Sequence, residues 1–281
     1  MKKQYCTGGI KWFVVKGKSS EVFSCHINYY KQSPLFLLDE PLNIRDNIKC
    51  SLKCNNPCDH CHVVQGNNSQ LIDDSKEIRV LFYINSTCPQ ECSYCYCQSA
   101  LQNQLSLEKT IVFLNNIKNK YSNYLYQVIF CGGEPSIYPD LEKLIFETNN
   151  ILNPYKIPLY SSGINKRKFQ NISLFGRKLL DKLEINISCH PTGKVFNMHR
   201  FLETIELIRS NNILLSVSMV NHLINEPFIP IYKKIFNDLQ INFRLQEDHG
   251  IHGNRKNIIS KHLKKTSMSK FFKKINEETE Q

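Results

Sequence analysis

The feature that most constrains the fold is an alternation of short apolar runs with amphipathic stretches, which begins at residue 78. The apolar runs have the length of strands, and the stretches between them carry apolar residues at near-helical spacing. This alternation predicts repeated β–α units with a parallel sheet. The predicted strands are 78–85, 126–130, 157–161, 182–188, 213–220 and 241–245.

Helices are predicted between these strands. Ser106 and Asp140 can each cap the start of one helix, and further helices are predicted at 167–180, 198–210 and 228–239. Six β–α units in roughly 170 residues are too few for an eight-fold barrel. The sequence therefore predicts an α/β fold, a partial (β/α)6 TIM-like barrel.

The predicted organisation has four segments. Residues 1–62 form a small cysteine-rich domain that includes a strand pair, 11–15 and 21–24, and residues 63–77 form a polar linker. The barrel spans 78–250, and 251–281 is a basic tail or helix. The net charge of +11 gathers partly in this tail. A solvated surface is the simplest explanation of that charge, and a site for nucleic acid is the alternative.

Cysteine usage bears on the compartment. The 281 residues include 12 cysteines. The N-terminus lacks the apolar core of a signal peptide, and no apolar run is long enough to cross a membrane. We therefore expect a cytoplasmic protein without a membrane partner, in which clustered cysteines hold metal more often than they form disulfides.

The first candidate metal site follows the first predicted strand. Cys88, Cys92 and Cys95 have the spacing C-x3-C-x2-C. Three thiolates on one loop can each bind one iron of a [4Fe–4S] cluster and leave the fourth iron open to a small molecule. Cys97 lies too close to Cys95 to serve easily as a fourth ligand. A zinc site is the alternative, because Cys92 and Cys95 also have zinc-ribbon spacing.

A glycine-rich loop follows the second predicted strand. It consists of Gly132, Gly133, Glu134 and Pro135. Two glycines at a strand end allow the backbone to approach a ligand closely, and a carboxylate can accept hydrogen bonds from an ammonium group. Ligands bind at the carboxyl edge of parallel strands, so we expect the cysteines and this loop to open onto the same edge.

The ordered pair, C-x3-C-x-aromatic-C after one strand and Gly-Gly-Glu-Pro after the next, resembles the radical S-adenosylmethionine (radical SAM) superfamily over roughly residues 78–248. The resemblance implies a [4Fe–4S] cluster on Cys88, Cys92 and Cys95, with S-adenosylmethionine on the open iron. It also implies one-electron cleavage of this cofactor to a 5′-deoxyadenosyl radical that abstracts hydrogen from a substrate. No catalytic residue is assigned beyond the cluster ligands.

The resemblance further implies roles for single residues. Tyr94 would lie near the adenine, and the loop Gly132–Pro135 would receive the methionine amino group. Looser matches suggest cofactor contacts after later strands, at Ser161, Ser162, Gly163, Ser188 and Asn221. A cap or turn role is the alternative for each of these later residues. His190, after the fourth strand, is either a substrate contact or a satisfied polar residue.

A second cysteine triad, Cys54, Cys58 and Cys61, repeats the spacing of the first. No strand pattern precedes it and no Gly-Gly-Glu-Pro follows, so the later triad is the one assigned to S-adenosylmethionine. Together with Cys6 and Cys25, this region resembles the auxiliary-cluster domains called SPASM or twitch, although these usually follow the barrel. The five cysteines are candidates for four positions on a second [4Fe–4S] cluster, with Cys50 spare. A structural Zn²⁺ is the alternative, because His26, His60 and His62 flank them.

The sequence thus predicts a radical SAM enzyme that modifies a peptide or protein side chain, supplied with electrons by a flavodoxin or ferredoxin. One alternative is a radical SAM enzyme that acts on a nucleoside, an RNA or a small molecule. The other is a non-catalytic zinc or iron–sulfur protein that binds a partner.

Overall fold

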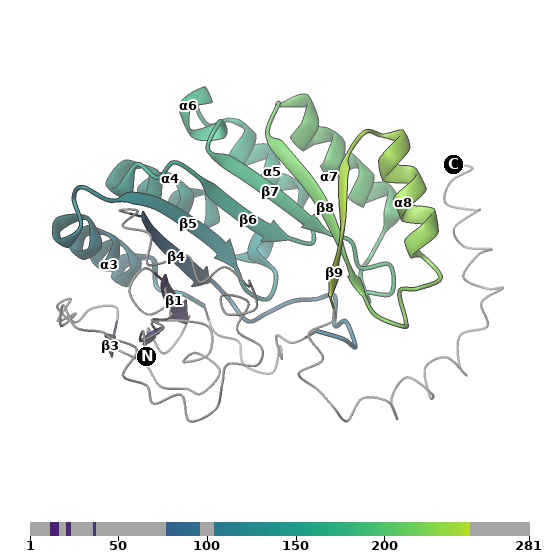
Figure 1. The fold of residues 1–281 in the computed structure, drawn as a ribbon, viewed down its shortest axis with the longest axis horizontal. Coiled ribbons are helices and arrows are strands. Elements are labelled where there is room, and N and C mark those ends of the chain that lie inside the picture. The colour runs from purple at the N-terminus through teal and green to yellow at the C-terminus, as the bar shows by residue number, and fades with distance from the viewer. Residues whose placement is uncertain (1–11, 17–20, 24–35, 38–76, 96–103, 248–281) are drawn as a thin grey trace, which may run out of the picture. The chain divides into compact units, whose positions relative to one another are not determined.

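The computed structural model describes residues 12–16, 21–23, 36–37, 77–95 and 104–247, which form two compact units. Unit 1 comprises residues 1–86 and 102–158, and unit 2 comprises 87–101 and 159–281. Strands and helices alternate from β4 onward, as Figure 1 shows. The six main strands are β4 (Glu77–Tyr83), β5 (Leu125–Cys131), β6 (Ile157–Ser161), β7 (Leu183–Ser188), β8 (Leu214–Asn221) and β9 (Asn242–Glu247).

These strands confirm the predicted fold class, the partial (β/α)6 arrangement. The intervening helices are α3 (Leu107–Lys120), α4 (Leu141–Leu152), α5 (Lys166–Ser173), α6 (Arg177–Leu180), α7 (Met198–Ser210) and α8 (Ile229–Asp238), with a short 3-10 turn η1 (Pro135–Ile137). Ser106 caps α3 as predicted, since its hydroxyl accepts a hydrogen bond from the Lys109 N–H. Asp140 occupies the cap position of α4 but makes no side-chain capping bond.

One predicted helix, 167–180, is wrong as a single element. The structure divides it into α5 and α6. Gly176 takes φ −59° and ψ 149° as the N-cap of α6, and these angles are not helical. The chain therefore starts a new helix at Arg177 instead of continuing the first.

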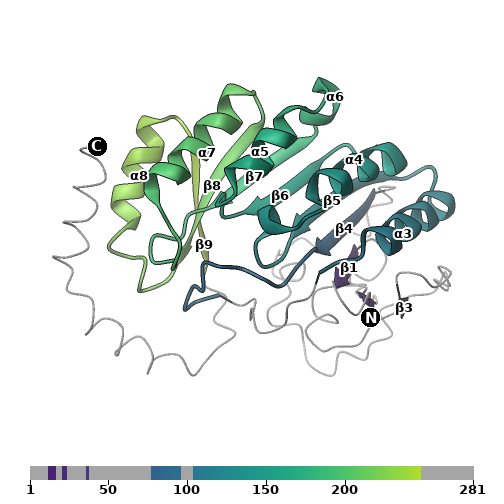
Figure 2. The same cartoon turned by 180° about the vertical axis from the view of Figure 1, so that it is seen from behind.

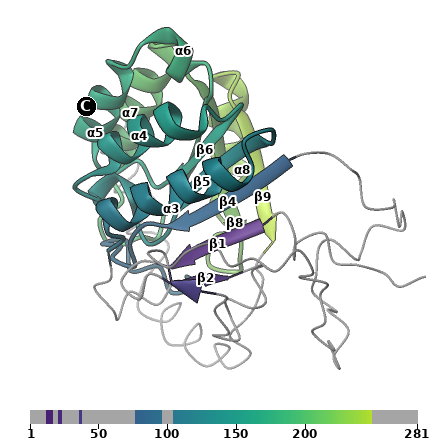
Figure 3. The same cartoon turned by 90° about the vertical axis from the view of Figure 1, so that its left-hand side faces the viewer.

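The core of unit 1 lies between β4–β5 and two helices. The two strands pair in parallel with Ile78 opposite Tyr126, Val80 opposite Val128 and Phe82 opposite Phe130, and all six side chains are buried. Figures 1 and 3 show α3 and α4 on one face of this strand pair. The Phe82 ring stacks on Phe130 and meets Phe113 of α3 edge-on, with centroid separations of 5.8 and 6.0 Å.

The N-terminal strand pair is present as predicted. β1 (Trp12–Lys16) and β2 (Glu21–Phe23) pair antiparallel, and β3 (Phe36–Leu37) adds to β2. The sequence did not predict that β1 would pair in parallel with β4, from Trp12 opposite Arg79 to Lys16 opposite Tyr83. β1 therefore extends the sheet of unit 1 beyond β4. The domain boundaries proposed from sequence stay predictions.

Unit 2 contains the end of β6 and the parallel strands β7, β8 and β9. Figure 2 shows α5, α7 and α8 along one face of these strands. Residues on that face are apolar, as Ile185, Ile187 and Val217 illustrate. The alternate residues are polar: the Asn186 amide donates to Ser216 Oγ at 2.9 Å, and the Ser218 hydroxyl donates to Asn186 Oδ1 at 2.8 Å. Strand alternation thus gives unit 2 one apolar and one polar sheet face.

Within the part of the chain that the structure describes, no helix combines the length and the apolar composition that a membrane crossing requires.

Removing the aromatic ring at position 82 tests the core of unit 1. We expect Phe82→Ala to lower the free energy of unfolding by about 3–5 kcal/mol, because the fully buried ring leaves a cavity against Phe113 and Phe130. Val112→Ala on the exposed side of α3 is the control, with an expected change within about 0.5 kcal/mol. Urea unfolding followed by circular dichroism measures both; equal destabilisation would contradict this packing.

Candidate metal and cofactor site

The first cysteine triad forms a tight turn in unit 2. The Cys95 N–H donates to the Cys92 carbonyl oxygen at 3.0 Å, and Glu91 adopts a left-handed conformation with φ 47°. The three residues Cys88, Cys92 and Cys95 are partly exposed. The turn therefore gathers three cysteines from eight consecutive residues.

This turn is anchored to the segment that follows β7. The Lys194 N–H donates to the Gln90 carbonyl oxygen at 2.8 Å, and Lys194 Nζ pairs with Glu91 Oε1 at 2.8 Å. Gly193 packs so closely against the Gln90 side chain that a Cβ there would overlap Gln90 Oε1. Gln90 is 1% exposed, and neither polar atom of its amide has a hydrogen-bond partner. Close packing, more than side-chain hydrogen bonding, therefore holds Gln90 in place.

The thiols suit an iron–sulfur cluster. Burial, together with the nearby Cys95 and Cys88, raises the pKa of Cys92 to about 12, against a lowering contribution from its hydrogen bond with Tyr94. Without metal this group is therefore a thiol, and bound iron would supply the positive charge that holds it as a thiolate. No three Cys, His, Asp or Glu side chains among the described residues are placed to share one metal ion. A cluster does not need such convergence, because each cysteine binds a different iron.

Tyr94 is buried beside this triad. Its hydroxyl lies 2.8 Å from His190 Nδ1, and the Cys92 thiol and the Asn225 amide are near enough to influence its pKa. The Tyr94 ring packs between His190 and His222, with centroid separations of 5.9 and 5.4 Å. Burial, and then the proximity of Cys92, raises the pKa of Tyr94, so the hydroxyl keeps its proton. Surrounding protein atoms lower the pKa of the partly exposed His190 to about 4, so its ring is neutral.

Asn225 contributes an unpaired acceptor next to Tyr94. It lies in the loop after β8, is fully buried, and donates from Nδ2 to the Val220 carbonyl oxygen at 2.9 Å. Its Oδ1 atom has no partner. A buried orphan acceptor beside the tyrosine that is expected near an adenine fits a nucleoside ligand, whose hydroxyl or amino groups can donate to it.

The glycine loop in unit 1 is clamped by Asn85, which follows β4. The Gly133 N–H donates to the Asn85 carbonyl oxygen at 2.8 Å, and Asn85 Nδ2 donates to the Glu134 carbonyl oxygen at 2.9 Å. Gly132 has φ 144°, and a Cβ on it would overlap the Asn85 carbonyl oxygen. Only glycine satisfies both the backbone angle and the close approach. Two residues, Ser86 and Thr87, separate Asn85 from Cys88 along the chain.

Glu134 is 1% exposed, and its Oε1 accepts from the Ser136 N–H at 2.8 Å. The carboxylate therefore caps the short turn η1, which begins at Pro135. Asn85 Oδ1 is buried without a partner at this loop. The buried Asn85 Oδ1 and the Glu134 carboxylate could each accept a hydrogen bond from the ammonium group that the sequence resemblance predicts here.

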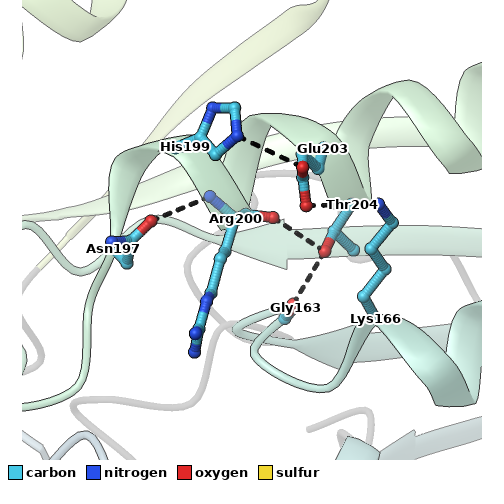
Figure 4. A network of polar contacts seen from close by, with 7 residues as sticks. All are labelled: Gly163, Lys166, Asn197, His199, Arg200, Glu203 and Thr204. Atoms are coloured by element: carbon cyan, nitrogen blue, oxygen red, sulfur yellow. Dashed lines mark hydrogen bonds and ion pairs between the residues drawn. The ribbon is translucent and has the colours of Figure 1, made fainter. Parts of the chain in front are cut away.

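The loop after β6 is fixed by α7, as Figure 4 shows. The Ser161 hydroxyl accepts from the Gly163 N–H at 3.0 Å, and Gly163 has φ 72°. The Thr204 hydroxyl lies within donating distance of the carbonyl oxygens of Gly163 and Arg200, at 3.1 and 3.0 Å. Ser161 and Ser162 are buried. Turn formation accounts for Ser161, so its cofactor role stays a prediction.

Ser188 and Asn221 lie at the ends of β7 and β8 but on opposite faces. Ser188 pairs in register with Ser218 and shares the polar face with Asn186. Asn221 alternates onto the face of Val217 and Met219, and its side chain is exposed. The structure therefore does not bring these two predicted contacts together.

The predicted auxiliary ligands Cys6, Cys25, Cys54, Cys58 and Cys61 lie outside the described residues, as do Cys50, Cys97 and the basic tail. Cys131 and Cys189 are free thiols beside strand ends. Burial raises the pKa of each, which agrees with the structural role that the sequence suggested.

Sequence reasoning missed Asn85, Gln90 and Asn225. Each is a buried polar residue in a loop that follows a strand. Nothing in the local sequence singles them out, because amide side chains are common in loops.

Replacing Gly132 tests the clamp. We expect Gly132→Ala to lower stability by at least about 1–3 kcal/mol, because alanine is strained at this φ and displaces the Asn85 backbone. Gly176→Ala is the matched control, since a Cβ there meets nothing within 4 Å, and only about 1 kcal/mol of N-cap stability is at risk. Thermal unfolding of both variants measures these changes. An unchanged melting temperature in Gly132→Ala would contradict the clamp.

Comparison with known proteins shows the family and the fold of the chain. The family model described as Radical SAM superfamily matches residues 82–227, more than half of the chain. No curated protein matches the chain. A structure of anSMEcpe with bound AdoMet has a TM-score of 0.51 at 15% identity, and the match covers 61% of this chain and 51% of that one.

Two structures of SuiB from Streptococcus suis also match, each with a TM-score of 0.51 at 15% identity. One is bound to S-adenosylmethionine and the other to the precursor peptide SuiA. The matches cover 64% of this chain and 42% and 40% of those chains. The chain thus spans 51%, 42% and 40% of the lengths of these three structures, and at such identity the likeness concerns the fold alone.

Proposed function

Since the chain belongs to the radical SAM superfamily, we propose that Cys88, Cys92 and Cys95 hold a [4Fe–4S] cluster that binds S-adenosylmethionine. The substrate in this proposal is a peptide or protein side chain. The observation that carries the proposal is the cysteine turn, because it gathers Cys88, Cys92 and Cys95 beside the buried Tyr94. Three ligands leave one iron available to the cofactor.

When bound, the cluster and S-adenosylmethionine supply one-electron bond cleavage and hydrogen abstraction. The residues of the chain bind and orient the cofactor. In unit 2, Asn225 Oδ1 offers an acceptor to the nucleoside, and Tyr94 offers an aromatic face. In unit 1, the loop held by Asn85 offers the buried carboxylate of Glu134 to the ammonium group. Burial of these groups restricts water, which a radical reaction requires.

Two observations favour a peptide or protein substrate. The cysteine-rich N-terminal region resembles auxiliary-cluster domains of enzymes that modify peptides and proteins. One solved structure of similar fold contains a precursor peptide, SuiA. A short peptide encoded beside the gene, changed in mass by the reduced enzyme, would identify the substrate.

Replacing a cluster ligand tests the proposal. Anaerobically reconstituted protein reduced with dithionite should convert S-adenosylmethionine to 5′-deoxyadenosine, and Cys92→Ala should abolish this product because one iron loses its ligand. Cys131→Ala is the control, since this cysteine ends β5 and is no predicted ligand. Chromatography quantifies the product. Wild-type protein that carries a full cluster and yields no 5′-deoxyadenosine would overturn the proposal.

The second triad makes a separate prediction. Cys58→Ala should remove a second metal centre while S-adenosylmethionine cleavage in the absence of substrate continues, because the first triad is intact. A content of roughly eight iron atoms per chain would indicate two [4Fe–4S] clusters. Roughly four iron atoms and one zinc atom per chain would indicate one cluster and a structural Zn²⁺. Metal analysis of the wild type and the variant distinguishes these cases. Loss of cleavage in Cys58→Ala, with four iron retained, would contradict the assignment of the triads.

A further inference from the structure

Asn85, in the segment after β4, uses only half of its side-chain amide within unit 1. Its Nδ2 atom donates to the Glu134 carbonyl oxygen at 2.9 Å. The residue is 3% exposed, and among the described residues no donor reaches its Oδ1 atom. A buried acceptor without a donor costs free energy, and a ligand that brings an N–H group would remove this cost.

The orientation of this amide is settled by its partner. The carbonyl oxygen of Glu134 can only accept, so the Asn85 atom that faces it is the nitrogen. Oδ1 therefore lies on the other branch of the amide, 3.3 Å from the point that a Cβ on Gly132 would occupy. The unused acceptor and the missing side chain of Gly132 thus lie next to each other at the glycine loop.

The backbone around Asn85 is held from two sides. The Ile84 N–H donates to the Cys131 carbonyl oxygen at 2.9 Å, and the Leu105 N–H donates to the Ile84 carbonyl oxygen at 2.8 Å. The Gly133 N–H donates to the Asn85 carbonyl oxygen, also at 2.8 Å. All these residues belong to unit 1. Oδ1 is therefore presented in a fixed position, which reduces the entropy that a ligand loses on binding.

The second acceptor at this loop is the carboxylate of Glu134, which is 1% exposed. Its Oε1 atom accepts from the Ser136 N–H, and a carboxylate oxygen has lone pairs for more than one donor. Two acceptors at one loop call for a ligand group with at least two N–H donors. An amino group meets this need, and it keeps two N–H donors even when its lone pair binds a metal.

We propose that Asn85 Oδ1 accepts a hydrogen bond from the amino group of S-adenosylmethionine, so that Asn85 is a specificity-determining residue for this cofactor. The inference rests on the proposed function, because it requires S-adenosylmethionine at the glycine loop. It gives the two atoms of one amide separate tasks: Nδ2 clamps the loop, and Oδ1 contacts the ligand.

The test is equilibrium dialysis of S-adenosylmethionine with the reconstituted full-length protein, with iron content measured in each variant. Asn85→Leu has a similar size and removes both polar atoms. It should weaken binding roughly 10- to 100-fold, the range for a hydrogen bond that involves a charged group. Asn85→Asp loses the Nδ2 donor and keeps an acceptor at the position of Oδ1, so it should bind as tightly as wild type or more tightly.

Two controls separate this contact from the clamp. The analogue of S-adenosylmethionine with hydrogen in place of the amino group should bind Asn85→Leu no more weakly than wild type. Asn115→Leu should leave affinity unchanged, since Asn115 is exposed on α3 and donates to Ile111 of its own helix. Both Asn85 variants should melt at a lower temperature than wild type, because both lose the bond to the Glu134 carbonyl oxygen.

Equal losses of affinity in Asn85→Asp and Asn85→Leu would overturn the inference, because Asn85 would then act only through the clamp. Unchanged affinity in Asn85→Leu would overturn it as well. If Asn85→Leu does not fold, Asn85→Asp decides alone, since weak binding by this folded variant contradicts a contact through Oδ1. Failure of the proposed function differs from these results, because wild-type protein with a full cluster would then not bind S-adenosylmethionine.

Discussion

Parallel pairing of β4 with β5 is the constraint on which unit 1 depends. The register from Glu77 opposite Leu125 to Tyr83 opposite Cys131 ends both strands at the same level. Asn85, just past β4, can therefore clamp the loop just past β5 with its backbone and its amide. Gly132 is required because this approach leaves no room for a Cβ. The buried face of the same two strands also forms the core. The pairing of β4 with β5 therefore determines both the core packing and the position of the loop.

In unit 2 the corresponding role falls to the segment after β7. It holds the cysteine turn through Lys194 and Gly193, and it places His190 against Tyr94. The loop after β8 adds Asn225 near Tyr94. The residues around the thiols thus come from loops that follow successive parallel strands, as expected for an α/β sheet.

The sequence predicted the barrel strands well because buried parallel strands read as apolar runs and the helices between them are amphipathic. It predicted the cysteine turn and the glycine loop because both are contiguous motifs. Asn225 and His190 acquire their roles only through contacts across loops, and a local pattern cannot encode these. The pairing of β1 with β4 is likewise a long-range contact. The break at Gly176 was missed because the apolar spacing continues through it.

The central claim is that the first triad holds a cluster with one iron open to S-adenosylmethionine. Electron paramagnetic resonance of the dithionite-reduced protein, recorded before and after addition of S-adenosylmethionine, tests it most directly. The Cys58→Ala protein isolates the first triad for this experiment. The account predicts a reduced [4Fe–4S] signal whose g values change when the cofactor is added. A signal that does not respond to S-adenosylmethionine, or that survives in Cys92→Ala, would contradict it.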